Sequence, residues 1–403
     1  MKMMTQVNLS ERISHDAGGC LTGRFPAILS VCASIALLLA WPVFGVSVVV
    51  DPYADVDWDA FEQHKANLHT HTTQSDGRGT PNEVVDEYHR RGYTILALTD
   101  HNLCTWPWTE FGSMERKGRA LMGDNAAERE PDVPSEERRN PEIPAYEDRD
   151  PETLGMLAIA GNEPSIHHHC CTFFVEYETR SRELEQTIEE VAALGGLVMI
   201  NHPGRYWDRN DDGAIPNEVV TRYTTLFQNY DNVVGVEVIN QGQRYKYDIH
   251  LWDRILAELM PEEPVWGFSN DDMHSLDRLG RDWNVFVVES LDEAQIRAAM
   301  ESGQFYFSTV GTHPDDVRNV EQTPVINAIT HDEEAGTLFI DASSGGVPLP
   351  EEQHRWISDN GVVVHTGATL NYRETAGIGV YVRAEMMGSG GTTFTNPFGI
   401  SAN

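Results

Sequence analysis

Histidine, aspartate and glutamate residues that could bind metal gather in five short segments in the middle of the chain. The segments read NLHTHTTQSDG (67–77), LTDHN (98–102), AGNEPSIHHH (160–169), INHPGR (200–205) and FSNDDMH (268–274). Each lies at or just after a short apolar run, which is typical of a buried parallel strand. Side chains at the carboxyl ends of parallel strands converge on one crevice. Because imidazole and carboxylate ligands together suit zinc, manganese or iron, the pattern predicts a metallohydrolase.

Alternating strand and helix signals would position these segments. We expect strands over 94–98, 155–161, 196–200, 232–240, 265–269, 284–289 and 304–309, and helices over 80–92, 182–194, 248–260 and 292–302. The first helix has a capping box, formed by Thr80 and Glu83, and a stop at Gly92. Repeated strand–helix units predict a parallel sheet or a barrel.

The first two segments contain three candidate ligands and one supporting carboxylate. His69 and His71 are two residues apart on an expected strand, so both face the same way, as two ligands of one metal require. Asp76 follows in a short turn. In the next segment we interpret His101 as a ligand and Asp100 as the carboxylate that orients its ring.

The third segment supplies a carboxylate and a histidine. Glu163 ends a strand, where a carboxylate can bridge two cations. Of the run His167–His169, His169 leads directly into the apolar CCTFFV strand, so we choose it as the ligand and keep His167 as the alternative.

The last two segments complete the set. His202 stands at a strand end, and Arg205 either contacts an anionic substrate or forms a surface ion pair. Asp272 and His274 have a D-x-H spacing that puts both on one face, with Asp271 competing for the role of Asp272.

The charge balance bears on partners. The 403 residues include 63 acidic and 29 basic side chains, for a net charge of −34, and only four of the basic residues are lysine. Such a surface repels nucleic-acid phosphate, so we expect no nucleic acid as a binding partner. The same charge is compatible with solubility or with adaptation to high salt.

The N-terminal region predicts export. Residues 25–50 form an uncharged apolar run that is long enough to span a bilayer and also resembles a signal-peptide core. We expect residues 1–50 to be a signal peptide or an N-terminal membrane anchor through 25–50. The rest of the chain would then be periplasmic, extracellular or membrane-anchored outside the cytoplasm.

Two further regions break the strand–helix alternation. Residues 103–153 are acidic and proline-rich, and we expect an insertion that shapes access of the substrate to the site. From about residue 320 the helical signals stop, and alternating segments with glycine- and asparagine-containing turns predict a small β-sandwich-like domain over 320–403.

The ordered set of motifs resembles the polymerase-and-histidinol-phosphatase (PHP) family of metal-dependent phosphoesterases. The resemblance covers about 64–310 and rests on LHTHT with Asp76, TDHN, GNE, NHPGR and the D-x-H that ends at His274. It implies a distorted (β/α)7 barrel, here over 51–315, with two or three divalent metal ions. The implied ligands are His69, His71, Glu163 and Asp272 for the first metal, Glu163, His169 and His202 for the second, and Asp76, His101 and His274 for the third.

The function that follows is hydrolysis of small organic phosphate mono- or diesters by a metal-activated hydroxide, outside the cytoplasm. His274 or His101 would assist protonation of the leaving group, and Arg205 would contact the substrate. The first alternative is a PHP-like ester or carbamate hydrolase. The second is a surface binding protein in which the C-terminal β domain is the functional part.

Overall fold

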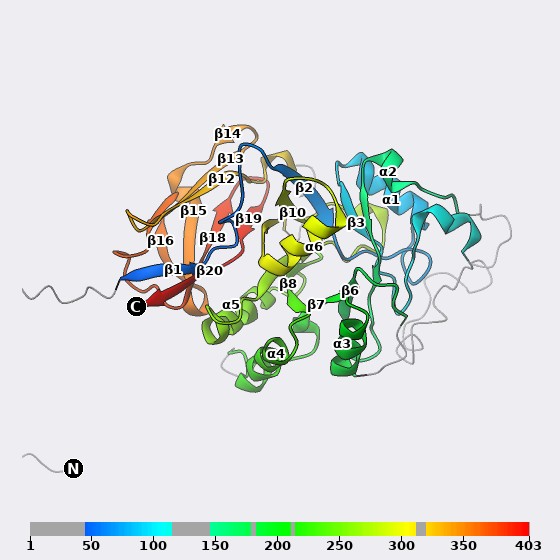
Figure 1. The fold of residues 1–403 in the computed structure, drawn as a ribbon, viewed down its shortest axis with the longest axis horizontal. Coiled ribbons are helices and arrows are strands. Elements are labelled where there is room, and N and C mark those ends of the chain that lie inside the picture. Colours follow the sequence, from blue (N-terminus) through cyan, green and yellow to red (C-terminus); the bar gives the residue numbers. More distant parts are fainter. Residues whose placement is uncertain (1–44, 115–145, 179–182, 211–213, 312–319, 403) are drawn as a thin grey trace, which may run out of the picture. The chain divides into compact units, whose positions relative to one another are not determined.

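The computed structural model describes residues 45–114, 146–178, 183–210, 214–311 and 320–402 (Figure 1). Its α-helices are α1 (Pro81–Arg90), α2 (Pro151–Leu154), α3 (Leu184–Ala193), α4 (Asn217–Asn229), α5 (Asp248–Leu259) and α6 (Glu293–Ser302). The strands that surround the candidate site are β2 (Glu62–Asn67), β3 (Ile95–Ala97), β4 (Leu157–Ile159), β5 (Gly161–Asn162), β6 (Cys170–Phe173), β7 (Leu197–Ile200), β8 (Val233–Asn240), β9 (Trp266–Asn270), β10 (Asp282–Val288) and β11 (Phe305–Thr309). The remaining strands are β1 (Val46–Val50), β12 (Val325–Asp332), β13 (Thr337–Ser344), β14 (Val347–Pro348), β15 (His354–Ser358), β16 (Val362–Thr366), β17 (Thr369–Asn371), β18 (Tyr381–Met387), β19 (Thr392–Thr395) and β20 (Phe398–Ala402).

Two sheets position the candidate site. One has the strand order β1-β20-β18-β19-β11-β10-β2-β3-β4, with β15 pairing β18 and β16 pairing β15, and the other has the order β5-β6-β7-β8-β9. The pairs β2–β3, β3–β4, β7–β8 and β8–β9 are parallel, as the alternation of strands and helices predicts. In contrast, β6 and β10 run antiparallel to their neighbours. The chain is therefore a mixed α/β protein with several sheets.

Strand pairing among the described residues does not close a barrel. The chain passes from β4 to β5, and so from one sheet to the other, through a single residue, Ala160. Beyond that step the two sheets meet at isolated parallel bridges between Thr70 and Met273 and between His101 and Glu163. His69 and His71 thus lie just after β2, and not on the strand where the sequence placed them.

Asparagine side chains take the place of backbone pairing where β9 meets β2 and β10. Asn270 Oδ1 accepts a hydrogen bond from the backbone N–H of Leu68 (3.0 Å). Asn284 accepts from the N–H of Ser269 and donates to its carbonyl oxygen, each at 3.0 Å. Because both asparagines are fully buried, these bonds satisfy backbone groups that water cannot reach.

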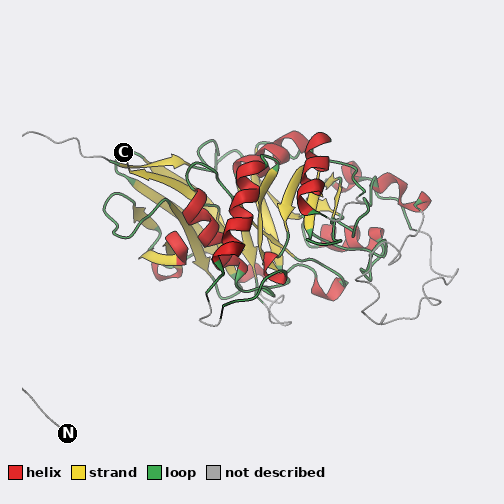
Figure 2. Cartoon of the chain, turned by 90° about the horizontal axis from the view of Figure 1, so that it is seen from below, coloured by secondary structure: helices red, strands yellow, loops and turns green. Residues whose placement is uncertain are grey.

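Apolar side chains fill the space below the candidate site. One cluster takes buried residues from nine strands, β2 to β4 and β6 to β11, among them Ala66, Ile95, Ile159, Phe173, Met199, Val234, Phe268, Phe286 and Phe305. A second cluster packs α3, α4 and α5 against β7 and β8, and these helices lie along one side of the strands (Figures 1 and 2). Burying each large apolar side chain contributes roughly 1.5–3 kcal/mol, so both clusters hold the loops above them in place.

The start of α1 agrees with the prediction from the sequence. Glu83 donates its backbone N–H to Thr80 Oγ1 (3.3 Å), and Glu83 Oε2 accepts from the N–H of Thr80 (2.8 Å), which completes the capping box. Gly92 follows the helix with φ of 77°, in the left-handed region that glycine adopts without strain. This helix begins soon after the loop that carries His69, His71 and Asp76.

Residues 320–402 contribute strands to two sheets. Strands β12, β13, β14 and β17 form a four-stranded sheet, whereas β15, β16 and β18–β20 extend the sheet that contains β2. Strand β1, which the sequence placed at the end of the N-terminal apolar run, pairs with β20. The C-terminal β domain as a separate unit stays a prediction. Residues 25–44 of the apolar run lie outside the described residues. Among the residues that the structure does describe, no helix is long and apolar enough to cross a membrane.

The described ends of the 103–153 region are packed into the protein. Trp108 and Phe111, in a short 3-10 helix (η1, Trp108–Ser113), are buried in one apolar cluster together with Tyr146. Trp108 therefore belongs to the core and does not line an opening. The proline-rich centre of the insertion, 115–145, lies outside the described residues.

A buried ion pair connects α5 to β18. Arg383 binds both carboxylate oxygens of Asp253 through Nε (2.8 Å) and Nη2 (2.9 Å), and each side chain is 2% exposed. We expect Arg383→Met to lower the free energy of unfolding by about 3–5 kcal/mol, because it leaves the Asp253 charge buried without its partner. Chemical denaturation measures this loss. The control is Arg90→Met, which breaks the exposed pair with Glu87 and should cost less than about 1 kcal/mol. Equal losses in the two variants would contradict the assignment.

Candidate metal centre

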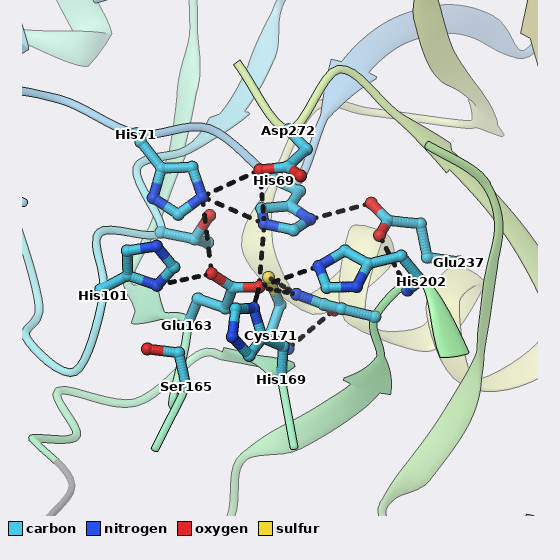
Figure 3. A network of polar contacts seen from close by, with 12 residues as sticks. His69, His71, His101, Glu163, Ser165, His169, Cys171, His202, Glu237 and Asp272 are labelled. Atoms are coloured by element: carbon cyan, nitrogen blue, oxygen red, sulfur yellow. Dashed lines mark hydrogen bonds and ion pairs between the residues drawn. The ribbon is translucent and has the colours of Figure 1, made fainter. Parts of the chain in front are cut away.

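The nine side chains that the sequence predicts as ligands lie together, in loops at the ends of strands of the two sheets. Figure 3 labels all of them except Asp76 and His274. They stand in the loops that follow β2, β3, β5, β7 and β9. The nine are His69, His71, Asp76, His101, Glu163, His169, His202, Asp272 and His274. Six imidazoles and three carboxylates in one place form a donor set that suits zinc, manganese or iron.

Glu163 lies at the centre of this cluster, with both carboxylate oxygens among imidazole nitrogens. Oε1 is 2.9 Å from His169 Nδ1, 3.2 Å from His69 Nε2 and 3.4 Å from His202 Nε2, and Oε2 is 2.8 Å from His101 Nδ1 and 3.5 Å from His71 Nε2. A carboxylate divided in this way between two groups of donors can bridge two cations.

Four overlapping groups of donor atoms could each hold a cation, because within a group the atoms lie within 4.8 Å of one another. The groups are His71, Asp76, His101 and His274; His69, Glu163 and His202; His69, His71 and Asp272; and His101, Glu163 and His169. Three differences from the allocation that the PHP resemblance implies are additions: His71 also joins the group around Asp76, His69 also joins Glu163 and His202, and His101 also joins Glu163 and His169. In addition, Glu163 is not in the group of His69, His71 and Asp272, and His169 and His202 are in separate groups.

The three consecutive histidines before β6 have different surroundings. His167 is exposed. His168 has both ring nitrogens engaged, since Nδ1–H donates to the carbonyl oxygen of His169 (2.9 Å) and Nε2 accepts from the hydroxyl of Tyr223 (2.8 Å). Only His169 faces Glu163. The structure thus places His169, and not its alternative His167, among the donors.

The two adjacent aspartates after β9 also separate. Asp272 Oδ1 lies 3.1 Å from His71 Nε2, inside the cluster. Asp271 accepts hydrogen bonds from the hydroxyl of Tyr88 (2.9 Å) and from the backbone N–H groups of residues 280–282, so it holds the loop before β10. Asp272 is therefore the donor.

Asp100 has a different role from the one that the sequence suggested. Its carboxylate accepts from the backbone N–H of Thr72 (2.7 Å) and from the hydroxyls of Ser75 (2.6 Å) and Thr105 (2.5 Å). The expectation that Asp100 orients the ring of His101 is wrong, because His101 Nδ1 faces Glu163. Asp100 instead fixes the turn between His71 and Asp76, and with it the spacing of these two donors.

Glu237 is a functional candidate that the sequence reasoning missed. It is fully buried on β8, and its Oε1 accepts from Nδ1–H of His69 at 2.9 Å. This bond fixes the tautomer of His69 and turns Nε2 toward Glu163 and Asp272. Glu237 Oε2 accepts from the backbone N–H of His202 (3.1 Å), so one carboxylate positions two donors. The signal in the sequence was a single charged residue inside the apolar run NVVGVEVIN.

Asn201 and Cys171 adjoin the central carboxylate, and Cys171 is labelled in Figure 3. The Asn201 amide donates to Glu163 Oε1 (2.8 Å) and to Cys171 Sγ (3.2 Å), and its Oδ1 accepts from the N–H of Cys171 (3.0 Å). Asn201 thus links β6 to the central carboxylate and limits its rotation. Of the five cysteines in the chain, Cys104, Cys170 and Cys171 are described, and all three are free thiols.

The electrostatics of the cluster favour a bound cation. Burial alone would raise the pKa of Glu163, but His169, His69 and His101 outweigh it and hold that pKa well below its usual range. The pKa of Asp272 is likewise lowered, by His69 and His274 against the effect of burial. Asp76 Oδ1 and Glu163 Oε2 are buried and have no hydrogen-bond partner. Ionised, buried oxygens that accept no hydrogen bond are the groups that a divalent metal would satisfy.

The cluster is not equally buried on all sides. The side chain of His274 is 32% exposed, whereas those of His69 and His71 are fully buried. The Nδ1–H group of His274 donates to the carbonyl oxygen of Asp272 (2.8 Å), which leaves Nε2 facing Asp76. The edge formed by His274 and Asp76 is therefore where solvent reaches the donors.

Arg205 is not part of the donor cluster. It ends the 3-10 helix η5 (Pro203–Arg205), three residues after His202, and is exposed. From this position it can meet an anion that approaches the cluster, but the contact with a substrate stays a prediction.

Backbone strain concentrates at the same place. Among the described residues, seven other than glycine have a positive φ, and five of them lie in loops of the site: Asn102, His202, Gln241, Gln243 and Asp272. Each such residue costs of order 1–3 kcal/mol and persists only where the surrounding contacts fix it. The strained donors His202 and Asp272 are both held by residues of β8 and the turn after it, namely Glu237, Asn240 and Gln241.

Comparison with known proteins gives only distant matches. No family model and no curated protein matches the chain. Among solved structures it is similar to a two-domain protein from Bacteroides vulgatus that contains a predicted PHP-like metal-dependent phosphoesterase. The identity is 17%, the match covers 84% of this chain and 93% of that one, and the TM-score is 0.43.

Two further solved structures match over shorter stretches. An amidohydrolase from Chromobacterium violaceum has 16% identity, with 52% of this chain and 87% of that chain covered and a TM-score of 0.32. A lesion-specific endonuclease from Pyrococcus furiosus has 14% identity, with 60% of this chain and 56% of that chain covered and a TM-score of 0.34. These structural neighbours are thus a protein with a predicted PHP-like phosphoesterase, an amidohydrolase and an endonuclease, all at low identity.

Glu237 gives a direct test of how the site is held. We expect Glu237→Gln to weaken the binding of Mn²⁺ or Zn²⁺ by roughly 10–100-fold, because His69 loses the carboxylate that fixes its tautomer. Isothermal titration of the metal-free protein measures this change. The control is Glu258→Gln, which removes an exposed carboxylate of α5 and should leave the affinity unchanged. Unaltered affinity in Glu237→Gln would contradict the role given to Glu237.

Proposed function

We propose that this protein is a metal-dependent phosphoesterase that hydrolyses small organic phosphate esters. The observation that carries the proposal is Glu163, whose two oxygens lie within 3.5 Å of five imidazoles from different donor groups. A shared carboxylate of this kind suits sites with two or three divalent ions, and paired metals suit in-line displacement at phosphorus. The ordered motifs that resemble the PHP family support the same reading, including a distorted barrel built from the strands around the site.

Bound divalent ions supply two things, a nucleophile at neutral pH through the lowered pKa of water and neutralisation of charge on the phosphate oxygens. The chain holds and orients the donors. Glu237 and Asn201 fix His69 and Glu163, while Asp100 fixes the turn that carries Asp76. We assign Arg205 to the substrate phosphate, because it is exposed close to His202.

His101 and His274 act as donors in this proposal. Both face Asp76 Oδ1, at 3.5 Å and 3.4 Å, and belong to one donor group with it. A histidine that binds metal cannot freely give up a proton, so a role in protonating the leaving group stays a prediction.

Hydrolysis of chromogenic substrates tests the activity. We expect the full chain, reconstituted with Mn²⁺ or Zn²⁺, to release nitrophenol from p-nitrophenyl phosphate or bis(p-nitrophenyl) phosphate. His69→Ala/His71→Ala should reduce turnover to the uncatalysed background because two donors are lost. The control is His89→Ala, an exposed histidine at the end of α1. Cleavage of p-nitrophenyl acetate alone, with metal bound, would select the ester hydrolase. Failure to bind any divalent metal would overturn the catalytic proposal.

We also propose that the protein acts outside the cytoplasm. The support is the uncharged apolar run over 25–50, which is long enough to span a bilayer. Expressed in a bacterial host, the full chain should fractionate with the periplasm, the medium or the membrane. A variant that lacks residues 2–43 should stay in the cytoplasm. Cytoplasmic recovery of both forms would refute export.

A further inference from the structure

The loops after β7 and β8 place aromatic and basic side chains next to the metal centre. Tyr206 follows His202 and Arg205, and Tyr245 lies in the turn between β8 and α5. The ring centroid of His202 is 5.5 Å from that of Tyr245 and 6.3 Å from that of Tyr206. The backbone N–H of His169 donates to the Tyr206 hydroxyl (2.9 Å), which fixes that ring to a second donor. One side of the donor cluster is therefore bordered by two tyrosines.

Arg244 is linked to the metal centre through one intermediate. Its Nη1 donates to Gln241 Oε1 (3.2 Å), and Gln241 Nε2 donates to Asp272 Oδ2 (2.8 Å). The guanidinium also lies 5.3 Å from the ring centroid of Tyr245. The strained backbone at Gln241 and Gln243, with φ of 46° and 66°, sets the turn that makes these contacts. Arg244 is thus held beside the donors, although its side chain is exposed.

Two more cations lie against Tyr247, two residues after Tyr245. The Arg209 guanidinium lies 3.9 Å from the ring centroid of Tyr247, and Lys246 Nζ lies 5.0 Å from the same ring. Aromatic faces stabilise these cations and limit their freedom. Lys246 is one of only four lysines in a chain with net charge −34. Within the described residues, none of Arg205, Arg209, Arg244 and Lys246 forms an ion pair with a carboxylate. Four unpaired cations beside one site leave room for an external anion.

We propose that this border, defined as Arg209, Arg244, Tyr245, Lys246 and Tyr247, binds a second anionic group on the organic part of the substrate. The inference rests on the proposed phosphoesterase activity, in which Arg205 and the donors receive the scissile phosphate. The substrate class is then a phosphate ester whose alcohol carries a carboxylate or a further phosphate. Both groups are anionic oxygen acceptors that a guanidinium binds with two parallel hydrogen bonds.

A pair of substrates that differ only in the distal anion tests this. We would compare phenyl phosphate with 4-carboxyphenyl phosphate by the release of inorganic phosphate that the full chain, loaded with Mn²⁺, catalyses. The wild type should show a kcat/KM roughly tenfold higher for a substrate with the second anion. Arg244→Gln should bring this ratio close to one, mainly through KM, and added salt should reduce it. The control, Arg355→Gln, changes an exposed arginine of β15 and should keep the ratio.

Binding of unreactive analogues separates failure of this inference from failure of the phosphoesterase proposal. Phenylphosphonate and 4-carboxyphenylphosphonate are titrated into the metal-loaded wild type and into Arg244→Gln. Tighter binding of the carboxylated analogue, lost in Arg244→Gln, supports the border even if no ester is hydrolysed. Equal binding of the two analogues to the wild type, or a preference that survives Arg244→Gln and Arg209→Gln, would overturn it whatever the activity.

Discussion

The rest of the site depends on one constraint, a glutamate charge placed where water cannot reach it. Glu163 is fully buried, and its oxygens face five imidazoles. An isolated carboxylate in such a place would be too costly, so the surrounding groups must supply positive charge or donors. The histidines and the Asn201 amide supply part of this, and Oε2 still has no hydrogen-bond partner. The loops after β2, β3, β5 and β7 converge here, and each brings at least one imidazole to this one group. A divalent ion bound here would balance the charge that the surrounding groups leave uncompensated.

Strand β8 shows how a scaffold supports such a centre without giving it a ligand. Among the described residues it contributes none of the nine donors, yet Glu237 positions His69 and the backbone of His202, and Asn240 donates to Glu237 (3.0 Å) and to Asp272 (3.2 Å). These contacts act on donors from three other loops. Because an error of about 1 Å in a reacting group can cost 10²-fold in rate, such supports matter as much as the ligands they hold. The turn after β8 then continues outward through Gln241 to Arg244, so the same strand connects the donors to the border where a substrate would arrive.

The structure brings the nine candidate donors together, and the sequence could single them out because they are of few residue types and follow apolar runs whose ends can be read locally; that they bind metal stays a prediction. The sequence predicted other features from local patterns in the same way. These are the helices α1, α3, α5 and α6 and the strand ends near His101, His202 and Asp272. Other features depend on partners far apart in the chain. Asp100 accepts hydrogen bonds from Thr72 and Ser75, which lie 28 and 25 residues earlier in the chain. The side-chain amide of Asn284 links β10 to β9 by hydrogen bonds. Strands β18 and β19 join the sheet of β2, so these strands are separated by an even longer stretch of the chain. Local periodicity carries no information on such pairings. Glu237 lies between these cases, since its charge inside an apolar strand was visible but the partner His69 was not.

The strong negative charge of the chain and an anionic substrate can coexist because electrostatic forces act over a limited range. At physiological ionic strength, interactions between exposed charges fade beyond about 8 Å, so carboxylates elsewhere on the surface do not act on a small anion at the site. There the local field would be set by the cations that the centre is proposed to bind and by Arg205, Arg209, Arg244 and Lys246. A long polyanion such as a nucleic acid would extend past this border onto the acidic surface and be repelled over many contacts. A small phosphate ester would not. If the proposed border binds anions, the acidic surface and the border would together favour small anions over polymeric ones.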